Sequence, residues 1–324
     1  MIIRLTKKEL RASAAVATAA VTLVACSNSD PLAEDTASDS GAGDTKTITI
    51  GTANFPESEI IGQIWAQTLR DAGYTVSVKS GIGSREVYVA ALAEGSVDIV
   101  PEYSGNLAQF YLDDQDALPV GSSQDDVVKA LQRVVPEGLQ VGDLAPAESK
   151  DSYRVTKKFA KEHGLNTLGD LKKLTAAGQR IRLAGNPELS QRPYGPQGLE
   201  QVYGVPAKDV ELVAISDGGG PLTIASLLSG ASDMADIYTT SPALDDKGEP
   251  VDVVELQDPK GMILPQNVVP LMRSSVPEDA QKALNAIDSK LTTDALKIMN
   301  TRNVGKDKTS AEVLGKDFAT KNAD

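Results

Sequence analysis

Residues 47–78 read TITIGTANFPESEIIGQIWAQTLRDAGYTVSV, a stretch that contains one complete strand–helix–strand unit. The β-branched run at 47–50 and the alternating run at 74–78 predict two strands. Between them, Pro56 predicts the first turn of a helix whose apolar positions 60, 61, 64, 65 and 69 share one face. The unit predicts an α/β fold whose strands are mostly parallel.

The same alternation continues along the rest of the chain. A helix is predicted over 84–94 and a strand over 97–100, which Pro101 is expected to end. A second group begins near residue 152, with a strand to 156, helices around 159 and 171, and strands at 181–183, 211–215 and 233–238. The chain then returns with a strand at 267–271 and two helices, 277–291 and 293–300.

A chain that ends in helices after returning to its first group of elements is expected to form two lobes joined by two crossings. We place the crossings near residues 150 and 263. Lobe 1 would then comprise residues 46–150 and 264–324, and lobe 2 residues 151–263. About 280 residues are enough for a sizeable core in each lobe.

The first 25 residues have the features of a secretory signal. Four basic residues precede an apolar run from Ala12 to Ala25, which is too short to cross a membrane. The sequence Leu23-Val24-Ala25-Cys26 resembles the lipobox of bacterial lipoproteins, in which the cysteine is acylated and becomes the new N-terminus. A buried structural cysteine is the alternative, but the Ser- and Asp-rich run after Cys26 has nothing to bury it. We therefore expect a lipid anchor at Cys26, on the outer face of the cell membrane.

Residues 26–45 lack apolar periodicity and predict a flexible tether. The whole chain has 32 basic and 45 acidic side chains, a net charge of −13. This charge argues against binding to nucleic acid and against adhesion to an anionic membrane through a basic patch.

No catalytic arrangement is apparent. His163 is the only histidine and ends a predicted helix before Gly164, where a polar or cationic ring is an ordinary C-terminal feature. With Cys26 acylated, a nucleophile would have only this one histidine as a base. Clusters of histidine and cysteine that would bind a metal are also lacking. We expect no enzyme activity, no cofactor and no metal.

Two further motifs have simple explanations. Gly218-Gly219-Gly220 precedes a helix over 222–228 but lacks the Lys and Ser/Thr of a phosphate loop. It predicts either a tight turn or free backbone N–H groups that face a cleft. Glu57 and Glu59 lie in a first helical turn, where the helix dipole alone favours carboxylates.

Three tyrosines lie at positions typical of a ligand cleft, although aromatic residues make up only 4% of the chain. Tyr103 follows a predicted strand, Tyr153 lies at the first crossing, and Tyr238 closes another strand. In open α/β sheets, the carboxyl ends of the strands face the ligand crevice. Each tyrosine taken alone is more often half-buried packing. Together they predict one shared cleft.

At this point the chain resembles the osmoprotectant-binding proteins of ABC transporters, which capture glycine betaine, choline and related quaternary amines. The resemblance covers nearly all of residues 46–324. Its most specific part is Pro101-Glu102-Tyr103-Ser104-Gly105. The other matching parts follow in order: residues 50–55 (IGTANF), 151–153 (DSY), 191–192 (QR), 237–240 (IYTT) and 261–267 (GMILPQN).

This resemblance implies a two-lobed, periplasmic-binding-protein-like (type II) fold that closes on a ligand in the cleft between the lobes. It implies that Tyr103, Tyr153 and Tyr238 form the walls of an aromatic cage. Arg192 would then meet a carboxylate on the ligand, unless it is a surface charge or an interlobe salt bridge. Asn106, Asp151 and Gln266 are further candidate contacts.

Two positions depart from the family pattern. Gln266 stands where similar members usually have another cage tyrosine, and Ala53 stands where a lysine or glutamine is common. Either Tyr194 or Phe55 would refill the missing wall. The departures leave open a receptor for a different amine or a bulkier zwitterion.

We therefore expect an extracytoplasmic, lipid-anchored binding protein that delivers a small quaternary amine to the permease of an ABC importer. The alternatives from other classes are a secreted lipoprotein hydrolase and a structural surface lipoprotein. The lack of a nucleophile with a partner base disfavours the first.

Overall fold

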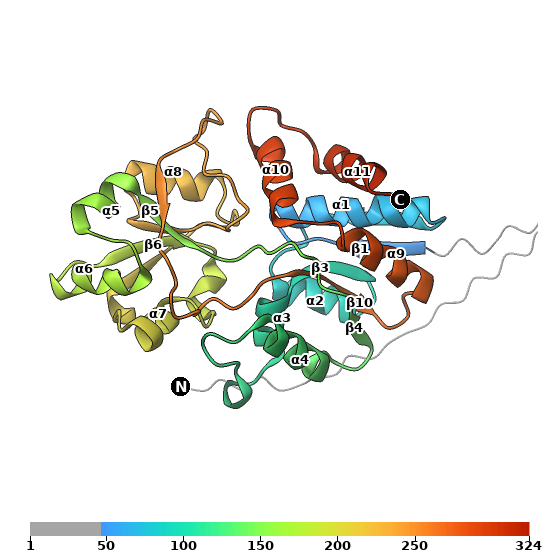
Figure 1. Cartoon of the computed structure of the whole chain (residues 1–324), viewed down its shortest axis with the longest axis horizontal. Coiled ribbons are helices and arrows are strands. Elements are labelled where there is room, and N and C mark those ends of the chain that lie inside the picture. Colours follow the sequence, from blue (N-terminus) through green and yellow to red (C-terminus); the bar gives the residue numbers. More distant parts are fainter. Residues whose placement is uncertain (1–46, 324) are drawn as a thin grey trace, which may run out of the picture. The chain divides into compact units, whose positions relative to one another are not determined.

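The structure, a computed structural model, describes residues 47–323. The predicted leader (1–25) and tether (26–45), with Cys26, lie outside the described residues. Two five-stranded sheets organise this part of the chain, and each has helices on both faces. We call the part around the first sheet lobe 1 and the part around the second lobe 2 (Figure 1).

Lobe 1 has the strand order β2-β1-β3-β10-β4. Its strands are β1 (Thr47–Gly51), β2 (Thr75–Lys79), β3 (Ile99–Tyr103), β4 (Leu139–Val141) and β10 (Val268–Arg273). One face is covered by α1 (Pro56–Asp71), α9 (Glu278–Asp288), α10 (Thr293–Val304) and α11 (Ala311–Lys321). The other face is covered by α2 (Arg85–Ala93), α3 (Ser104–Tyr111) and α4 (Gln124–Val134).

Lobe 2 has the strand order β7-β6-β8-β5-β9. Its strands are β5 (Tyr153–Thr156), β6 (Ile181–Gly185), β7 (Val210–Ala214), β8 (Met234–Asp236) and β9 (Val253–Glu255). Helices α5 (Lys157–His163), α6 (Lys172–Ala176) and α7 (Pro196–Tyr203) pack on one face, and α8 (Pro221–Ser229) packs on the other.

The prediction of mostly parallel strands is confirmed, although both sheets are mixed: in each, four strands run in one direction and one runs against them. β1 pairs in parallel with β2 and β3, but β10 is antiparallel to both β3 and β4. In lobe 2, β6 is parallel to β7 and β8, whereas β5 is antiparallel to β8 and β9. The reversed strands, β10 and β5, are each the first strand after a crossing between the lobes, so the chain enters the sheet there from the opposite end.

Pro101 does not end its strand, contrary to the prediction, and β3 runs through it to Tyr103. Pro101 pairs with Pro270 of β10. The ladder hydrogen bonds from Arg273 N to Asp98 O and from Ser104 N to Asn267 O show that the hydrogen-bonded pairs fall on the even positions of β3. Pro101 and Pro270 therefore form a non-hydrogen-bonded pair, in which neither proline must donate to the other strand.

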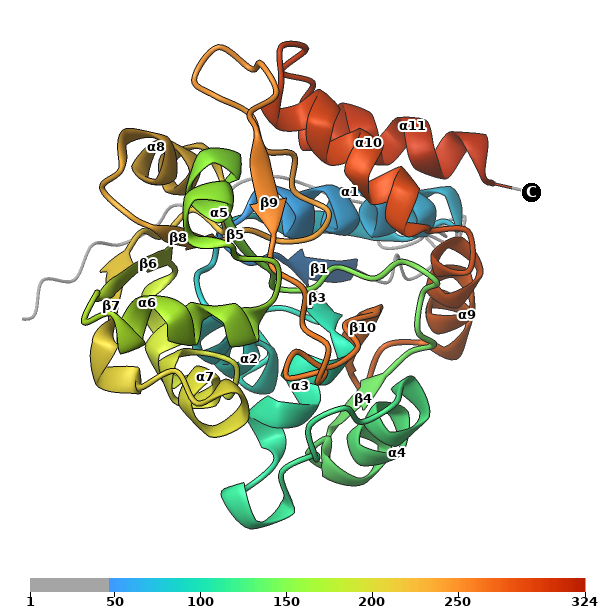
Figure 2. The same ribbon diagram turned by 60° about the vertical axis from the view of Figure 1, so that its left-hand side comes forward.

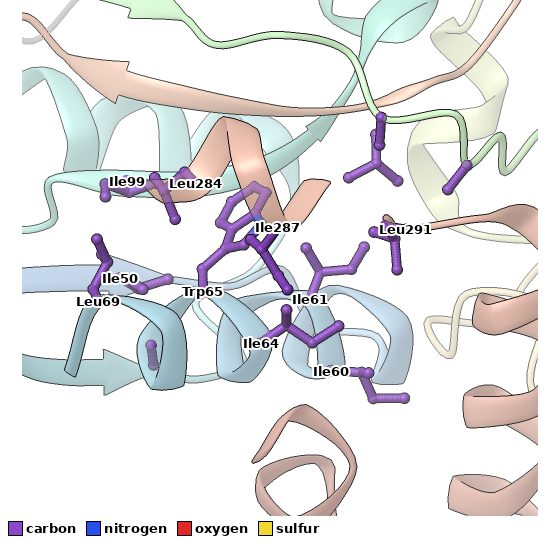
Figure 3. Close-up of a cluster of buried hydrophobic side chains, with 14 of the residues drawn as sticks. Ile50, Ile60, Ile61, Ile64, Trp65, Leu69, Ile99, Leu284, Ile287 and Leu291 are labelled. Carbon is purple, nitrogen blue, oxygen red and sulfur yellow. The ribbon is translucent and has the colours of Figure 1, made fainter. Parts of the chain in front are cut away.

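The predicted β1–α1–β2 unit is confirmed, and α1 contributes most of the core on its side of the sheet. Its residues Ile60, Ile61, Ile64, Trp65 and Leu69 are almost fully buried, as Figure 3 shows. The indole Nε1 of Trp65 donates to Asp288 Oδ1 at 2.7 Å, which satisfies its one polar atom inside the core.

Two segments connect the lobes, one between β4 and β5 and the other between β9 and β10 (Figures 1 and 2). They run antiparallel beside each other. Val268 N donates to Ala147 O, and Ser149 N donates to Gln266 O, both at 3.0 Å. Two crossings agree with the sequence-based expectation, whereas the boundaries placed near 150 and 263 stay predictions.

Candidate ligand pocket

A cavity with about 650 Å³ of empty space, part of it open to solvent, lies between the lobes. Lobe 1 contributes the loop after β1, the start of α2 and the end of β3. Lobe 2 contributes the segment after β6 and the end of β8, and the first crossing contributes Ser149 and Asp151. Ligand pockets typically have this size and this position between two units.

Aromatic rings form one continuous wall of the cavity. The rings of Phe55 and Tyr103 lie 6.1 Å apart, and those of Phe55 and Tyr238 lie 5.4 Å apart in an edge-to-face arrangement. Tyr103 ends β3 in lobe 1, and Tyr238 follows β8 in lobe 2. Phe55, the N-cap residue of α1, therefore joins aromatic residues of both lobes. Tyr194 and Tyr88 also line the cavity.

Tyr153 does not line the cavity. Its ring is packed in the core of lobe 2, and its hydroxyl donates to the backbone oxygen of Tyr194 at 2.5 Å. The first and third residues of β5 face this core, which places Tyr153 behind Tyr194. Direct contact between Tyr153 and a ligand stays a prediction, and the structure supports a positioning role.

Gln266 is also buried outside the cavity lining. Its Oε1 accepts from Asn106 N at 2.9 Å, and its Nε2 donates to Asn106 Oδ1 at 2.8 Å. Asn106 lines the cavity and donates from Nδ2 to Asp151 Oδ2 at 3.1 Å. Gln266 thus orients Asn106 and, through it, Asp151.

Arg192 lines the cavity and also bridges the lobes. Its Nη1 lies 3.1 Å from Oε1 of Glu86 on α2. The sequence left a cleft residue and an interlobe salt bridge as separate possibilities, and Arg192 has both positions.

A second arginine, Arg85, reaches the cavity from the start of α2. It makes a bidentate ion pair with Glu102 of β3, at 2.7 and 3.0 Å. Glu102 is fully buried and also accepts from the hydroxyl of Tyr88 at 2.8 Å and from Tyr103 N at 2.9 Å. The pair therefore fixes the positions of two aromatic residues of the lining.

Two carboxyl groups lie together in the cavity wall. Asp151 comes from the first crossing and Asp236 from the end of β8, and both are at least nine-tenths buried. Burial and the neighbouring carboxyl group of Asp151 raise the pKa of Asp236 well above its ordinary value. Oδ1 of Asp236 has no hydrogen-bond partner among the described residues.

The helix dipole does not fully explain Glu57, which is a correction to the sequence analysis. Its side chain is buried, with Oε1 accepting from the hydroxyl of Tyr103 at 2.8 Å and Oε2 accepting from Asn300 Nδ2 at 2.6 Å. Glu57 therefore orients the Tyr103 ring from behind, because it links the phenol to α10.

The glycine run forms a tight turn. Gly218 and Gly219 have φ values of 64° and 75°, and a Cβ on Gly219 would lie 2.7 Å from the Cα of Ile237. The carboxylate of Asp217 accepts from the backbone N–H groups of Leu222 and Thr223. The alternative of free N–H groups facing the cleft is therefore wrong for these two residues.

Residues 46–321 match OpuAC, the family described as the substrate binding domain of ABC-type glycine betaine transport systems. The chain belongs to this family. The resemblance drawn from the sequence is thereby confirmed. Because OpuAC domains bind a substrate for transport, membership also confirms that the chain is not an enzyme.

Two relatives show how far the OpuAC sequence has diverged. The chain is 25% identical to the glycine betaine-binding protein YehZ of Escherichia coli K12 over 234 residues, which cover 71% of this chain and 74% of YehZ. It is 28% identical to a glycine-betaine-binding protein of Pseudomonas aeruginosa over 173 residues, 51% of this chain and 54% of the relative.

Solved structures confirm the two-lobed α/β fold. A glycine betaine/carnitine/choline ABC transporter structure matches with a TM-score of 0.63 at 18% identity, over 86% of this chain and 98% of that one. YehZ from E. coli without ligand matches with a TM-score of 0.58 at 23% identity, over 85% and 98%. The structure of an ABC-transporter choline binding protein in complex with choline matches with a TM-score of 0.58 at 11% identity, over 86% of this chain and 89% of that one.

Within residues 47–323, no three His, Cys, Asp or Glu side chains are grouped so that they would hold a metal ion. His163 ends α5 and packs on Phe159, and Gly164 follows in the left-handed conformation, so the predicted C-terminal role is confirmed. No helix in this range is long and apolar enough to span a membrane. Substrate-binding proteins of ABC importers act outside the cytoplasm.

Proposed function

We propose that this OpuAC-family protein captures a quaternary amine of the glycine betaine or choline type between its lobes and delivers it to an ABC permease. The names of its relatives support this ligand class. The sequence of the first 26 residues supports a lipid anchor at Cys26 that holds the protein at the outer face of the cell membrane. The tether would let the binding unit reach the permease.

The aromatic wall supports the ligand class most directly. A quaternary ammonium has no N–H to donate, so it is held by the negative faces of aromatic rings. Tyr103, Phe55 and Tyr238 join both lobes along one cavity, and Tyr194 lines the same space. In this proposal Phe55 and Tyr194 take the place of the wall that Gln266 does not supply.

The rings alone do not ensure micromolar affinity. At about 0.5–2 kcal/mol for each cation–π contact, four rings supply roughly 2–8 kcal/mol, which meets the roughly 8 kcal/mol of micromolar binding only at its upper limit. The remaining affinity must come from charged groups in the cavity and from the exclusion of water as the lobes close. Closure would bend the two crossing segments, which we place at the proposed lobe boundaries near 150 and 263.

A thermal-shift screen tests the ligand class. Glycine betaine, choline and carnitine would be compared with 3,3-dimethyl-1-butanol, which has the shape of choline without its charge. A ligand that binds only the folded state stabilises it by about 2.7 kcal/mol at a hundredfold excess over Kd. We expect at least one of the amines to raise the midpoint and the neutral alcohol to leave it unchanged. Equal shifts with the alcohol would exclude recognition of the cation.

Arg192→Ala is expected to lower the affinity for glycine betaine about tenfold or more and to change the affinity for choline less than about threefold. The guanidinium lines the cavity and can turn from Glu86 to a ligand carboxylate, and a charge-assisted hydrogen bond contributes about 1.5–3 kcal/mol. Choline has no carboxylate and does not gain this contact. Calorimetric titration of both ligands measures the two changes.

Tyr103→Leu is the matched control for Arg192→Ala. It removes an aromatic face and keeps an apolar side chain, so both ligands should lose affinity by a similar factor, about tenfold. If Arg192→Ala lowered the affinity for choline as much as the affinity for glycine betaine, the assignment of Arg192 to the ligand carboxylate would be wrong.

A further inference from the structure

The buried ion pair between Arg85 and Glu102 presents its positive member to the cavity. Glu102 is fully buried behind the lining, whereas Arg85, which is 9% exposed, belongs to the lining itself. The pair uses Nε and Nη2 of the guanidinium, at 2.7 and 3.0 Å from the two carboxylate oxygens. Nη1 has no hydrogen-bond partner among the described residues, so its two N–H groups remain available to a ligand.

A second guanidinium lies at the same end of α2. Arg192 lines the cavity, and its Nη1 is 3.1 Å from Oε1 of Glu86, the residue that follows Arg85 on the helix. Both arginines act electrostatically on the phenols of Tyr88 and Tyr194, which line the same cavity. The guanidinium groups are therefore close enough to act on one ligand group.

The two arginines differ in what a ligand must displace. The side chain of Glu86 is 50% exposed, so its pair with Arg192 lies at the solvent boundary, where such a pair contributes little. A ligand carboxylate has to draw Arg192 away from this partner. Arg85 keeps both of its bonds to Glu102 while Nη1 binds an additional acceptor.

The surroundings of Arg85 favour an anion. Gly83 and Ser84 lead into α2 and line the cavity, and the side chain of Ser84 does not cap the helix. The positive end of the helix dipole therefore adds to the charge of the two arginines. Ala53 lines the same cavity and has no polar side chain to offer a ligand.

We propose that Arg85 binds the carboxylate of the ligand through Nη1, together with Arg192, and that the cavity therefore prefers a quaternary amine that carries a carboxylate. The inference rests on the proposed function and narrows its ligand class to betaines, such as glycine betaine and carnitine. The aromatic wall holds the cation, which choline also has. Glu102 has an indirect role, because the bidentate pair keeps the guanidinium in one orientation.

Arg85→Lys tests the contact. Lysine keeps a positive charge beside Glu102, but its single ammonium cannot replace two nitrogens on Glu102 and a third on the ligand. The affinity for glycine betaine should fall about tenfold, and the affinity for choline should change less than about threefold. Calorimetric titration of both ligands measures the two changes, after circular dichroism has shown that the variant is folded.

Arg182→Lys is the matched control. Arg182 makes the same kind of bidentate pair, with Asp233 of lobe 2, and is not part of the cavity lining. It should change neither affinity more than about twofold. If Arg85→Lys does not fold, the double variant Arg85→Met with Glu102→Gln replaces it, because this variant leaves no buried charge unpaired. The same selective loss of glycine betaine is expected.

Two results with the folded variant would overturn the inference. Equal losses for both ligands would mean that Arg85 only positions the aromatic wall, and an unchanged affinity for glycine betaine would mean that Arg85 makes no contact. A wild-type protein that bound choline but not glycine betaine would also overturn the inference and leave the proposed function intact. If the wild type bound no quaternary amine, the proposed function itself would fail.

Discussion

Glu102→Gln is expected to lower the free energy of unfolding by about 3–5 kcal/mol, because it leaves the buried charge of Arg85 without its partner. Burial by itself would lower the pKa of Arg85, but the Glu102 carboxylate raises it well above the ordinary value, so the guanidinium stays charged. Glutamine would also turn an amide N–H₂ toward a site that receives donors from Arg85, Tyr88 and the backbone of Tyr103.

Thermal or urea unfolding measures this loss. In a unit of this size, the midpoint should fall by roughly 10 °C. Glu278→Gln is the control, because the Glu278–Lys282 pair on α9 is exposed and such pairs contribute little. The double variant Arg85→Met with Glu102→Gln should recover much of the stability, because no unpaired charge remains buried. If Glu102→Gln and Glu278→Gln had the same unfolding midpoint, the buried pair would not stabilise the fold.

Asp288→Asn is expected to stabilise the protein above neutral pH. Burial raises the pKa of Asp288 to about 8, although the hydrogen bond from Trp65 acts in the opposite direction. Its Oδ2 has no hydrogen-bond partner among the described residues. Asparagine keeps an acceptor for the Trp65 indole and removes the charge.

The sign of the pH effect follows from the raised pKa. The folded state binds the Asp288 proton more tightly than the unfolded state does, because the pKa of an aspartate in the unfolded chain is about 3.9. This contribution to stability is complete below about pH 4 and is lost as the pH rises toward 8. We expect the wild type to lose more than about 2 kcal/mol relative to Asp288→Asn between about pH 5 and pH 9. Urea titrations at both pH values give the difference.

Asp71→Asn, which removes an exposed carboxylate near the end of α1, is the control for this pH effect. Its difference from the wild type should stay constant over the same pH range. A constant difference for Asp288→Asn as well would mean that Asp288 is already ionised in the folded protein.

Periodicity in the sequence was sufficient to predict much of the fold. The helical face of α1 was predicted from its apolar spacing, and those side chains are buried in the core. The direction of β10 was not predictable in this way, because it depends on how the chain returns from lobe 2. The prediction that Pro101 ends its strand failed for a related reason. A proline is tolerated in an inner strand where the pairing places no donor, and only the partner strand reveals this.

For the pocket, the sequence predicted Tyr103 and Tyr238 because strand ends face the crevice. It did not distinguish Tyr153 from Tyr194, since the register of β5 and a hydrogen bond decide which ring faces the cavity. It also missed Arg85, Glu102 and Asp236. Glu102 and Asp236 are charged residues within buried strands, and this unusual placement was the signal that could have singled them out.

Calorimetric titration of the purified protein with choline, beside its neutral isostere 3,3-dimethyl-1-butanol, tests the central claim most directly. The account predicts one choline bound per chain with a Kd in the micromolar range or below, and no heat of binding with the alcohol. It also predicts that Tyr103→Leu weakens the choline complex. Two results would contradict the claim that the aromatic wall between the lobes holds a cation. One is that choline, glycine betaine and carnitine all give no heat of binding, and the other is that Tyr103→Leu binds choline as tightly as the wild type.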